Sequence, residues 1–517
     1  MNTSEWISRS VSKLLPAPVP GNRKMAASTD SVPPAATAAP LADATAAATG
    51  APPGADSPAG ASAGATRTKP VMRSTRERLD GTLRHKGEAL SPRALRNTLA
   101  ELRSVIDGRI SEVEGGRRAR AVALWHGQAT PAQRRDCWLL MSEQFVADPQ
   151  VIKLAQSRFA AAVGTPDEAA AEVHYRRATV SPRRRLLQRF SVFPEGIRFL
   201  VDLRAEMLPS LKADPSLQAL DVEMEYMFST WFDVGFLDLR RISWDSPASL
   251  IEKLIKYEAV HDIKSWADVK NRLDSDRRCY GFFHPRLPDD PLIFVEVALL
   301  HEIAQGITPL LDEAAAVEDL NKATTAIFYS ISNTQAGLRG VSFGDSLIKR
   351  VVDTLKAEFP RLKIFSTLSP IPGFRPWLGK RAAAMLDKLD EKARTELTRA
   401  LGVEPVTAAH LLTAADKALE LDAKSPVRHL LMQCAAYYLG QELVGGKPLD
   451  PVARFHIGNG ARIERLNWAG DPSPKGMKQS YGLMVNYLYD LKRLERHRVM
   501  MAQGKVPVSA SVEDYFL

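Results

Sequence analysis

The sequence predicts an α+β fold, in which an N-terminal all-helical domain is followed by a mixed α/β domain. Helix start signals recur between residues 85 and 235 with no strand signal between them. Beyond Ile242 the chain instead carries short runs rich in β-branched and aromatic residues. A strand, a turn, a helix and a second strand then follow one another within about 45 residues, which predicts a crossover unit in the second domain.

Residues 1–75 form the first segment, which we expect to be a disordered extension. From residue 25 to residue 68 the chain consists mainly of Ala, Pro, Gly, Ser and Thr, and so few large apolar side chains cannot offset the entropy lost on ordering. Residues 1–24 carry an excess of basic side chains and only a short apolar patch. This pattern fits either an unstructured tail or a mitochondrial targeting segment.

The predicted helical domain covers residues 76–238. Its helices are expected to begin where a capping residue precedes a proline. The capping side chain accepts a hydrogen bond from an unpaired N–H of the first turn, and proline at the next position has no N–H to leave unpaired. A helical domain without site chemistry often mediates oligomerisation, and we expect that role here. The pairs are Ser91-Pro92, Thr130-Pro131, Thr165-Pro166, Ser181-Pro182 and Asp214-Pro215.

The predicted α/β domain covers residues 239–517. The runs at 279–284, 292–299, 324–332 and 362–368 are bounded by Pro, Gly or Asp, and they predict strands of a mixed sheet. Apolar residues recur on one face over residues 345–359, which predicts a helix between the last two strands. Further helices are expected over residues 380–443 and 478–497.

Composition excludes several classes of protein. Hydrophobic residues make up 45% and charged residues 25% of the 517 residues, which is the balance of a globular protein. The longest apolar run, over residues 291–300, contains Glu296 and is far shorter than the roughly 20 residues that cross a bilayer, so we expect no membrane partner. Cys137, Cys279 and Cys434 show no CxxC pairing, which favours core positions in a reducing compartment such as the cytoplasm.

The net charge of +9 and the pI of about 9.3 are compatible with nucleic acid, an anionic surface or an anionic small molecule such as coenzyme A. Clusters such as Arg117-Arg118 and Arg134-Arg135 fit either solvated helix faces or an anion site. A basic helical protein that binds nucleic acid through residues 85–235 is therefore an alternative. It leaves every motif after residue 324 unexplained, and we expect no nucleic-acid partner.

A glycine-containing turn between the predicted strand and helix is the first candidate site. Glycines let the backbone approach a ligand, and free N–H groups at a helix N-terminus point at bound anions, so a pyrophosphate fits here. The spacing is neither a P-loop nor a dinucleotide fingerprint. It resembles the pyrophosphate-binding turn of the acyl-CoA acetyltransferase superfamily, with Arg339, Ser342 and Gly344 in the matching places. Ser342 stands where that superfamily usually has glycine.

Two further residues could carry chemistry. Ser369 ends a predicted strand before two prolines and a glycine, so its hydroxyl is held on a rigid turn. His456 lies beside Gly458, Asn459 and Gly460. Taken alone, the serine fits a turn cap and the histidine fits a structural hydrogen bond.

Taken together, five segments of the chain resemble the malonyl-CoA decarboxylase family. They occur in order at residues 326–332, 334–340, 365–374, 451–459 and 482–487, and the likeness extends over about half the chain. The resemblance implies an acetyltransferase-like fold for the second domain. The C-terminus lacks the Ser-Lys-Leu peroxisomal address of some animal members.

The resemblance also implies site residues. The family's catalytic serine falls on Ser369 and its catalytic histidine on His456. Lys253 and Tyr489 are candidate supporting residues, and for Lys253 a surface role stays open. The CoA-binding turn falls on Arg339, Gly340, Val341, Ser342, Phe343, Gly344 and Asp345.

The activity implied is decarboxylation of malonyl-CoA to acetyl-CoA and CO2, with Ser369 and His456 handling the proton. A histidine suits this role because it ordinarily titrates near neutral pH. The thioester carbonyl itself accepts the electron pair, so no metal, biotin or pyridoxal phosphate is expected. His301-Glu302 does not complete the zinc-protease motif, and Met477-Lys478 does not complete the biotin-carrier motif. The resemblance further implies a homodimer or homotetramer, and a CoA-dependent acyltransferase with the same turn is the alternative activity.

Overall fold

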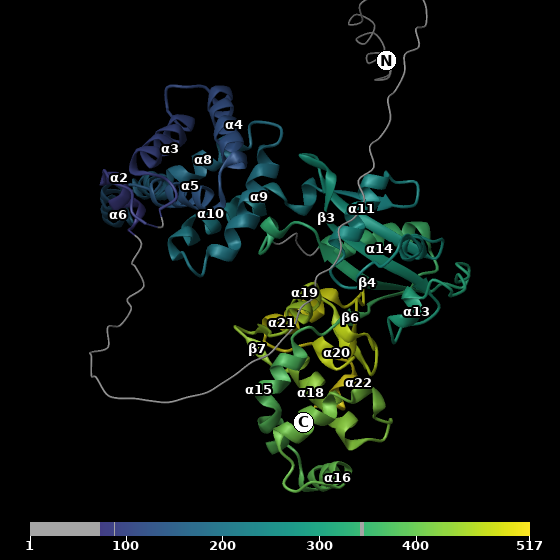
Figure 1. Ribbon diagram of the computed structural model, residues 1–517. Helices are drawn as coiled ribbons and strands as arrows, with labels where there is room; N and C mark the ends of the chain where they lie inside the picture. Colours follow the sequence, from purple (N-terminus) through teal and green to yellow (C-terminus); the bar gives the residue numbers. More distant parts are fainter. Residues whose placement is uncertain (1–72, 87, 342–345, 517) are drawn as a thin grey trace, which may run out of the picture. The chain divides into compact units, whose positions relative to one another are not determined.

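The computed structural model describes residues 73–86, 88–341 and 346–516, all within a compact unit that spans Pro70–Leu517 (Figure 1). The predicted disordered extension, residues 1–75, lies outside the described residues except for its last three. That prediction, like the boundaries of the two predicted domains, stays a prediction.

Helices make up the described chain up to residue 231. Ser91 and Thr130 cap α3 and α5 as predicted, because each side chain accepts the N–H of the third helical residue. Helix α8 begins at Pro182 as predicted, but Ser181 does not cap it, because its hydroxyl donates to Glu223 instead. The helices are α2 (Thr75–Asp80), α3 (Pro92–Val105), α4 (Glu112–Gln128), α5 (Pro131–Glu143), α6 (Pro149–Ala162), α7 (Glu168–Thr179), α8 (Pro182–Phe190), α9 (Gly196–Met207) and α10 (Gln218–Trp231).

Two helices begin later in the chain than the sequence predicts. At Thr165-Pro166 the helix begins only at Glu168, because the Thr165 hydroxyl accepts the N–H of Asp167 and closes a turn first. At Asp214-Pro215 a short 3-10 helix, η2 (Pro215–Leu217), precedes α10. In both places the capping residue and proline begin a turn that leads into the helix.

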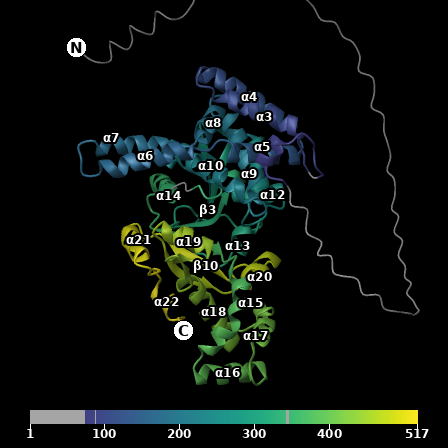
Figure 2. The ribbon, with the colours of Figure 1, turned by 90° about the vertical axis from the view of Figure 1, so that its left-hand side faces the viewer.

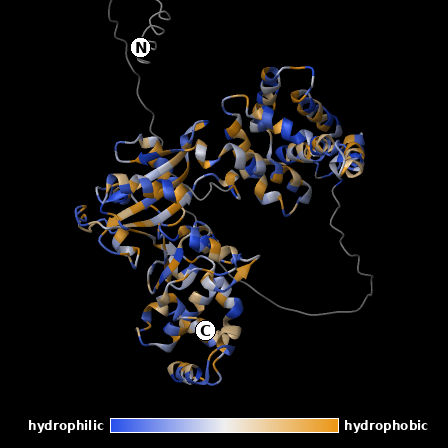
Figure 3. Cartoon of the chain, turned by 180° about the vertical axis from the view of Figure 1, so that it is seen from behind, coloured by the Kyte–Doolittle hydropathy of each residue, from blue (hydrophilic) through white to orange (hydrophobic). Residues whose placement is uncertain are grey.

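The second part of the chain is built on a mixed sheet of order β1-β2-β3-β4-β5-β10-β6, with β9 paired to β10. Among the strands that the structure describes in this sheet, only β4 and β5 pair in parallel. They are joined by α14 (Ser346–Glu358), the crossover that the sequence pattern predicted. Hydrophobic stretches run along its strands (Figure 3). The α+β prediction is confirmed. The strands are β1 (Asp238–Ile242), β2 (Arg277–His284), β3 (Leu287–Leu300), β4 (Thr325–Asn333), β5 (Ile364–Thr367), β6 (Ser369–Pro370), β9 (Arg462–Asn467) and β10 (Met484–Leu488).

The predicted helix over residues 478–497 is wrong. Strand β10 occupies its middle, between α20 (Pro474–Ser480) and α21 (Leu494–Ala502). Met484, Val485 and Tyr487 are all buried, so the strand shows no alternation of apolar and polar residues to mark it. Its backbone pairs with β9, the preceding strand, and with β5 and β6, which are distant in sequence.

Helices surround the sheet. On the crossover helix, Leu347, Ile348, Val351, Val352 and Leu355 are buried, as the predicted apolar face requires. Short helix α19 (Pro451–Gly458) lies against β10 (Figure 2). The remaining helices are α11 (Ala248–Tyr257), α12 (Trp266–Arg272), α13 (Thr308–Leu311), α15 (Phe374–Asp387), α16 (Glu391–Leu401), α17 (Ala408–Ala415), α18 (Pro426–Gly440) and α22 (Ala510–Glu513).

Candidate active site

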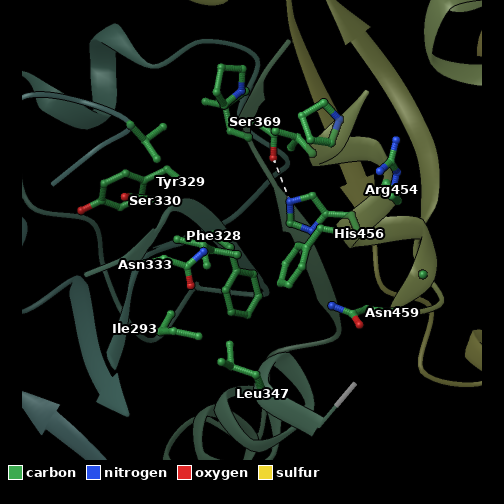
Figure 4. A pocket seen from close by; sticks show the side chains of 18 of the residues that line it. Ile293, Phe328, Tyr329, Ser330, Asn333, Leu347, Ser369, Arg454, His456 and Asn459 are labelled. Carbon is green, nitrogen blue, oxygen red and sulfur yellow. Dashed lines mark hydrogen bonds between the residues drawn. The ribbon is translucent and has the colours of Figure 1, made fainter. Parts of the chain in front are cut away.

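A cavity of about 600 Å³ is formed by side chains from β4, β6, α14 and α19. Figure 4 shows Ser369 and His456 together at one end of it and Ile293 and Leu347 at the other. The cavity wall is largely apolar, so a bound acyl group would lie away from bulk water beside a few polar groups.

Ser369 is fixed by the backbone on both sides. Its strand, β6, pairs with β10 through Val485, and Gly373 closes the following turn. A Cβ at Gly373 would lie 2.1 Å from the hydroxyl oxygen of Tyr438, so only glycine fits there. The Ser369 hydroxyl donates to Thr367 Oγ1 at 2.8 Å and lies 3.4 Å from His456 Nε2. Its oxygen is therefore directed at the imidazole.

His456 lies on α19, whose first turn is capped by Asp450. The Asp450 carboxylate accepts the N–H groups of Val452 and Ala453, each at 2.9 Å. The imidazole, 3% exposed, stacks on Tyr487 with ring centroids 4.7 Å apart. Its Nδ1 lies 2.7 Å from the hydroxyl oxygen of Tyr489. The imidazole is thus held between two hydroxyl groups, those of Ser369 and Tyr489.

Burial decides the charge of this group. Removal from water disfavours the imidazolium and lowers the pKa of His456 to about 3. The near-neutral pKa expected from the sequence is therefore wrong for His456 in this structure. Burial also raises the pKa of Tyr489 far above its ordinary value, so that phenol stays protonated. At neutral pH the described site holds a neutral imidazole.

A buried polar network under the cavity was not predicted. Ser330, on β4 at the cavity wall, donates to both carboxylate oxygens of Glu258, at 2.9 and 2.8 Å. Burial, together with the charge of Glu258, raises the pKa of Glu296 to about 8, although Arg272 contacts its carboxylate at 3.0 Å. Two features of the sequence could have indicated this network. Glu296 interrupts an apolar run, and Ser330 lies within a mainly apolar strand.

The predicted CoA turn is described only in part. Arg339 and Gly340 are exposed beyond η4 (Ala336–Leu338), and Val341 lines the cavity. Ser342, Phe343, Gly344 and Asp345 lie outside the described residues.

Of the two candidate supporting residues, only Tyr489 is brought to the site. Lys253 lies on α11, where its ammonium group is 2.8 Å from Asp290 Oδ1 and donates to the carbonyl of Asp289 at 2.8 Å. The structure does not bring Lys253 into contact with Ser369 or His456.

The described residues contain neither a cluster of metal ligands nor a membrane-spanning helix. Within the part of the chain that the structure describes, His, Cys, Asp and Glu side chains form no group of three or more that could hold a metal ion. Over the same residues, every helix is too short or too polar to cross a membrane.

The mixed sheet has one parallel crossover, and a buried imidazole lies between two hydroxyls at a cavity wall. This arrangement is typical of an enzyme with a buried site. The family models agree on which enzyme family. The malonyl-CoA decarboxylase C-terminal domain matches residues 235–516, and the N-terminal domain of the same family matches residues 145–232. The chain belongs to the malonyl-CoA decarboxylase family.

Individual relatives support this assignment. The mitochondrial malonyl-CoA decarboxylase of Rattus norvegicus is 38% identical over 400 residues, which cover 73% of this chain and 80% of the rat protein. That of Anser anser anser is 39% identical over 332 residues, which cover 61% and 66% of the two chains. The solved structure of malonyl-CoA decarboxylase from Rhodopseudomonas palustris is 40% identical, with a TM-score of 0.70, and the match covers 81% of this chain and 99% of that one.

Proposed function

We propose that this chain decarboxylates malonyl-CoA and releases acetyl-CoA and CO2. Membership of the family supports the substrate and the reaction. The observation that carries the proposal is the placement of His456 between Ser369 and Tyr489 at the wall of a cavity of about 600 Å³. This arrangement supplies a group that can gain and lose a proton where a substrate carbon would lie.

The reaction defines what the site must do. Breaking the bond to the carboxylate leaves an electron pair on the α-carbon, and the thioester carbonyl delocalises it as an enolate. That carbon then takes up one proton to become the methyl group of acetyl-CoA. Because the thioester is the electron sink, we propose that no metal, biotin or pyridoxal phosphate takes part. Hydrogen-bond donors near the enolate oxygen would lower the barrier by about 3 kcal/mol each.

We assign the proton-handling roles from the hydrogen bonds. Tyr489, which stays protonated, donates to Nδ1 of His456. The proton of the neutral imidazole then resides on Nε2, facing the oxygen of Ser369, whose own proton points to Thr367. In this arrangement Nδ1 accepts a hydrogen bond from Tyr489, and Nε2 carries the proton that faces Ser369.

Substrate binding would change the charge of the imidazole. The malonyl carboxylate, hydrogen-bonded by Ser369, would bring a negative charge beside Nε2, and an opposite charge raises the pKa of an imidazole. His456 takes up a proton from solvent on Nδ1 as the substrate binds, and the Tyr489 hydroxyl turns to accept it; the Nε2 proton then goes to the α-carbon after CO2 leaves. The imidazole ends the cycle neutral, as it began.

The remaining assignments follow the family pattern. We propose that CoA pyrophosphate binds the turn that begins at Arg339 and Gly340, which leads to Val341 at the cavity wall. We also propose that the chain forms a homodimer or homotetramer through its helical domain.

The direct test is incubation of the purified chain with malonyl-CoA while acetyl-CoA and CO2 are measured. Equal amounts of both products without any acceptor are expected. A CoA-dependent acyltransferase would release free CoA only when an acceptor is added. Ser369→Ala and His456→Asn should each lower kcat by roughly 10²-fold or more while CoA still binds. Turnover close to that of the unmodified chain in both variants would remove the two residues from the mechanism.

A further inference from the structure

A buried arginine of the helical region contacts the turn that follows β4. Arg204, on α9, is 1% exposed. Its Nη1 donates to the carbonyl oxygens of Gly337 at 2.9 Å and of Arg339 at 2.7 Å. Its Nε and Nη2 contact the carboxylates of Asp221 at 2.7 Å and Glu225 at 3.0 Å, both on α10. One guanidinium therefore fixes two carbonyls of the turn relative to two helices.

The turn itself fits closely against these helices. A Cβ at Gly337 would lie 1.9 Å from the carbonyl oxygen of Val201 on α9. Gly340 has a φ of +87°, which favours glycine, and a Cβ there would lie 3.0 Å from Glu225 Oε2. Gly337 is thus required by the close approach of α9, and Gly340 is favoured by its backbone conformation.

We propose that Arg204 is a positioning residue for coenzyme A binding, an inference that rests on the proposed function. A trans peptide is planar, so the N–H of Gly340 points opposite to the carbonyl of Arg339. By binding that carbonyl, Arg204 turns the Gly340 N–H away from α9 and α10. An N–H held in this direction can donate to an anionic oxygen of CoA without reorganising.

Charge balance is the second contribution of Arg204. The Glu225 carboxylate lies against Gly340, and alone it would repel a pyrophosphate. The single positive charge of Arg204, which is paired with both carboxylates, offsets one of the two negative charges of Glu225 and Asp221. Removing the guanidinium would leave the carboxylates of Glu225 and Asp221 without their positive partner beside the anion-binding turn. It would also release the carbonyls of Gly337 and Arg339 from their hydrogen bonds.

The test compares Arg204→Met with Arg183→Met. Arg183 is also a buried arginine of the helical region, but it donates only within that region, to the carbonyls of Met141, Ser142 and Ala219. We expect Arg204→Met to raise the KM for malonyl-CoA and the Kd for CoA by about tenfold or more, with kcat within about threefold of the unmodified chain. Arg183→Met should lower the melting temperature without changing either constant.

Arg204→Lys provides a second measurement if Arg204→Met does not fold. Lysine keeps the charge but cannot hold two carbonyls and two carboxylates in one plane, so KM and Kd should rise, though less than in Arg204→Met. An unchanged CoA Kd in a folded Arg204 variant would overturn the inference, as would an equal rise in Arg183→Met. If the unmodified chain binds CoA but does not decarboxylate malonyl-CoA, the proposed function fails separately.

Discussion

At the scale of single residues, the site depends on which hydroxyls contact the imidazole of His456. The Tyr489 hydroxyl lies 2.7 Å from Nδ1. The ring of Tyr487 stacks on the imidazole, and its hydroxyl has no hydrogen-bond partner among the described residues. Two neighbouring tyrosines therefore contribute different parts of their side chains to one histidine. Removing each hydroxyl separates orientation of the imidazole from simple packing around it.

Tyr489→Phe should lower kcat by about 10- to 100-fold, because the imidazole loses the bond that fixes its tautomer. CoA affinity should stay unchanged. Steady-state kinetics with malonyl-CoA, together with calorimetric titration of CoA, would measure both. Tyr487→Phe is the matched control and should keep kcat within about twofold, because it removes a hydroxyl that makes no described hydrogen bond. Equal losses in the two variants would argue against a specific role for the Tyr489 hydroxyl.

At the scale of elements, the placement of His456 depends on how α19 begins. The Asp450 carboxylate caps this helix and also accepts the Tyr438 hydroxyl at 3.2 Å. That same hydroxyl lies against Gly373, in the turn that follows Ser369. Asp450 and Tyr438 thus connect the helix that carries the histidine to the turn that follows the serine.

Asp450→Ala should lower both stability and kcat. Loss of a capping carboxylate destabilises by about 1 to 2 kcal/mol, and movement of α19 would separate His456 from Ser369. Asp390→Ala is the control, because Asp390 caps α16 in the same way, through the Ala393 N–H at 2.7 Å. Urea unfolding should show a loss in both variants, whereas turnover should fall only in Asp450→Ala. A normal kcat in Asp450→Ala would show that the cap does not position the histidine.

Elements with local signals were the ones that the sequence predicted well. The caps at Ser91 and Thr130 and the apolar face of α14 depend on residues within one or two helical turns. Strand β10 has no such signal, since its pairing with β5 and β6 and its burial are set by distant residues.

The same reasoning applies to the site. Ser369 and His456 were named through family resemblance, because no local pattern shows that residues 87 positions apart will meet. The Glu258 and Ser330 contact was missed for the same reason. The pKa of His456 could not be predicted either, since it depends on burial by the assembled fold.

At the scale of the whole molecule, buried histidines make the chain sensitive to acid. Burial lowers the pKa of His126 and of His261 to about 4 and that of His456 to about 3. In the unfolded chain each would titrate near 6.5. Below that pH the unfolded state binds more protons than the folded state, so stability is present above pH 6.5 and is lost as pH falls towards 4.

His126→Gln should make the free energy of unfolding less dependent on pH. This residue is far from the cavity in sequence, and its Nε2 accepts the indole N–H of Trp138 at 2.9 Å, a bond that a glutamine oxygen can keep. The fall in unfolding free energy between pH 6.5 and 4.5 should be smaller by about 2 to 3 kcal/mol than in the unmodified chain. Urea unfolding at both pH values measures it. His174→Gln, at an exposed position, is the control and should leave the fall in unfolding free energy between the two pH values unchanged.

The insertion of β10 between β5 and β9 also determines when the site around Ser369 and His456 can assemble during synthesis of the chain. Ser369 is added to the growing chain 87 residues before His456, but the strand that pairs with β6 and the tyrosine that contacts the imidazole come later still. A nascent chain that has not yet emerged from the ribosome as far as Tyr489 has the serine and the histidine without the strand that aligns them. The alignment of Ser369 and His456 therefore forms only after the chain up to Tyr489 has emerged.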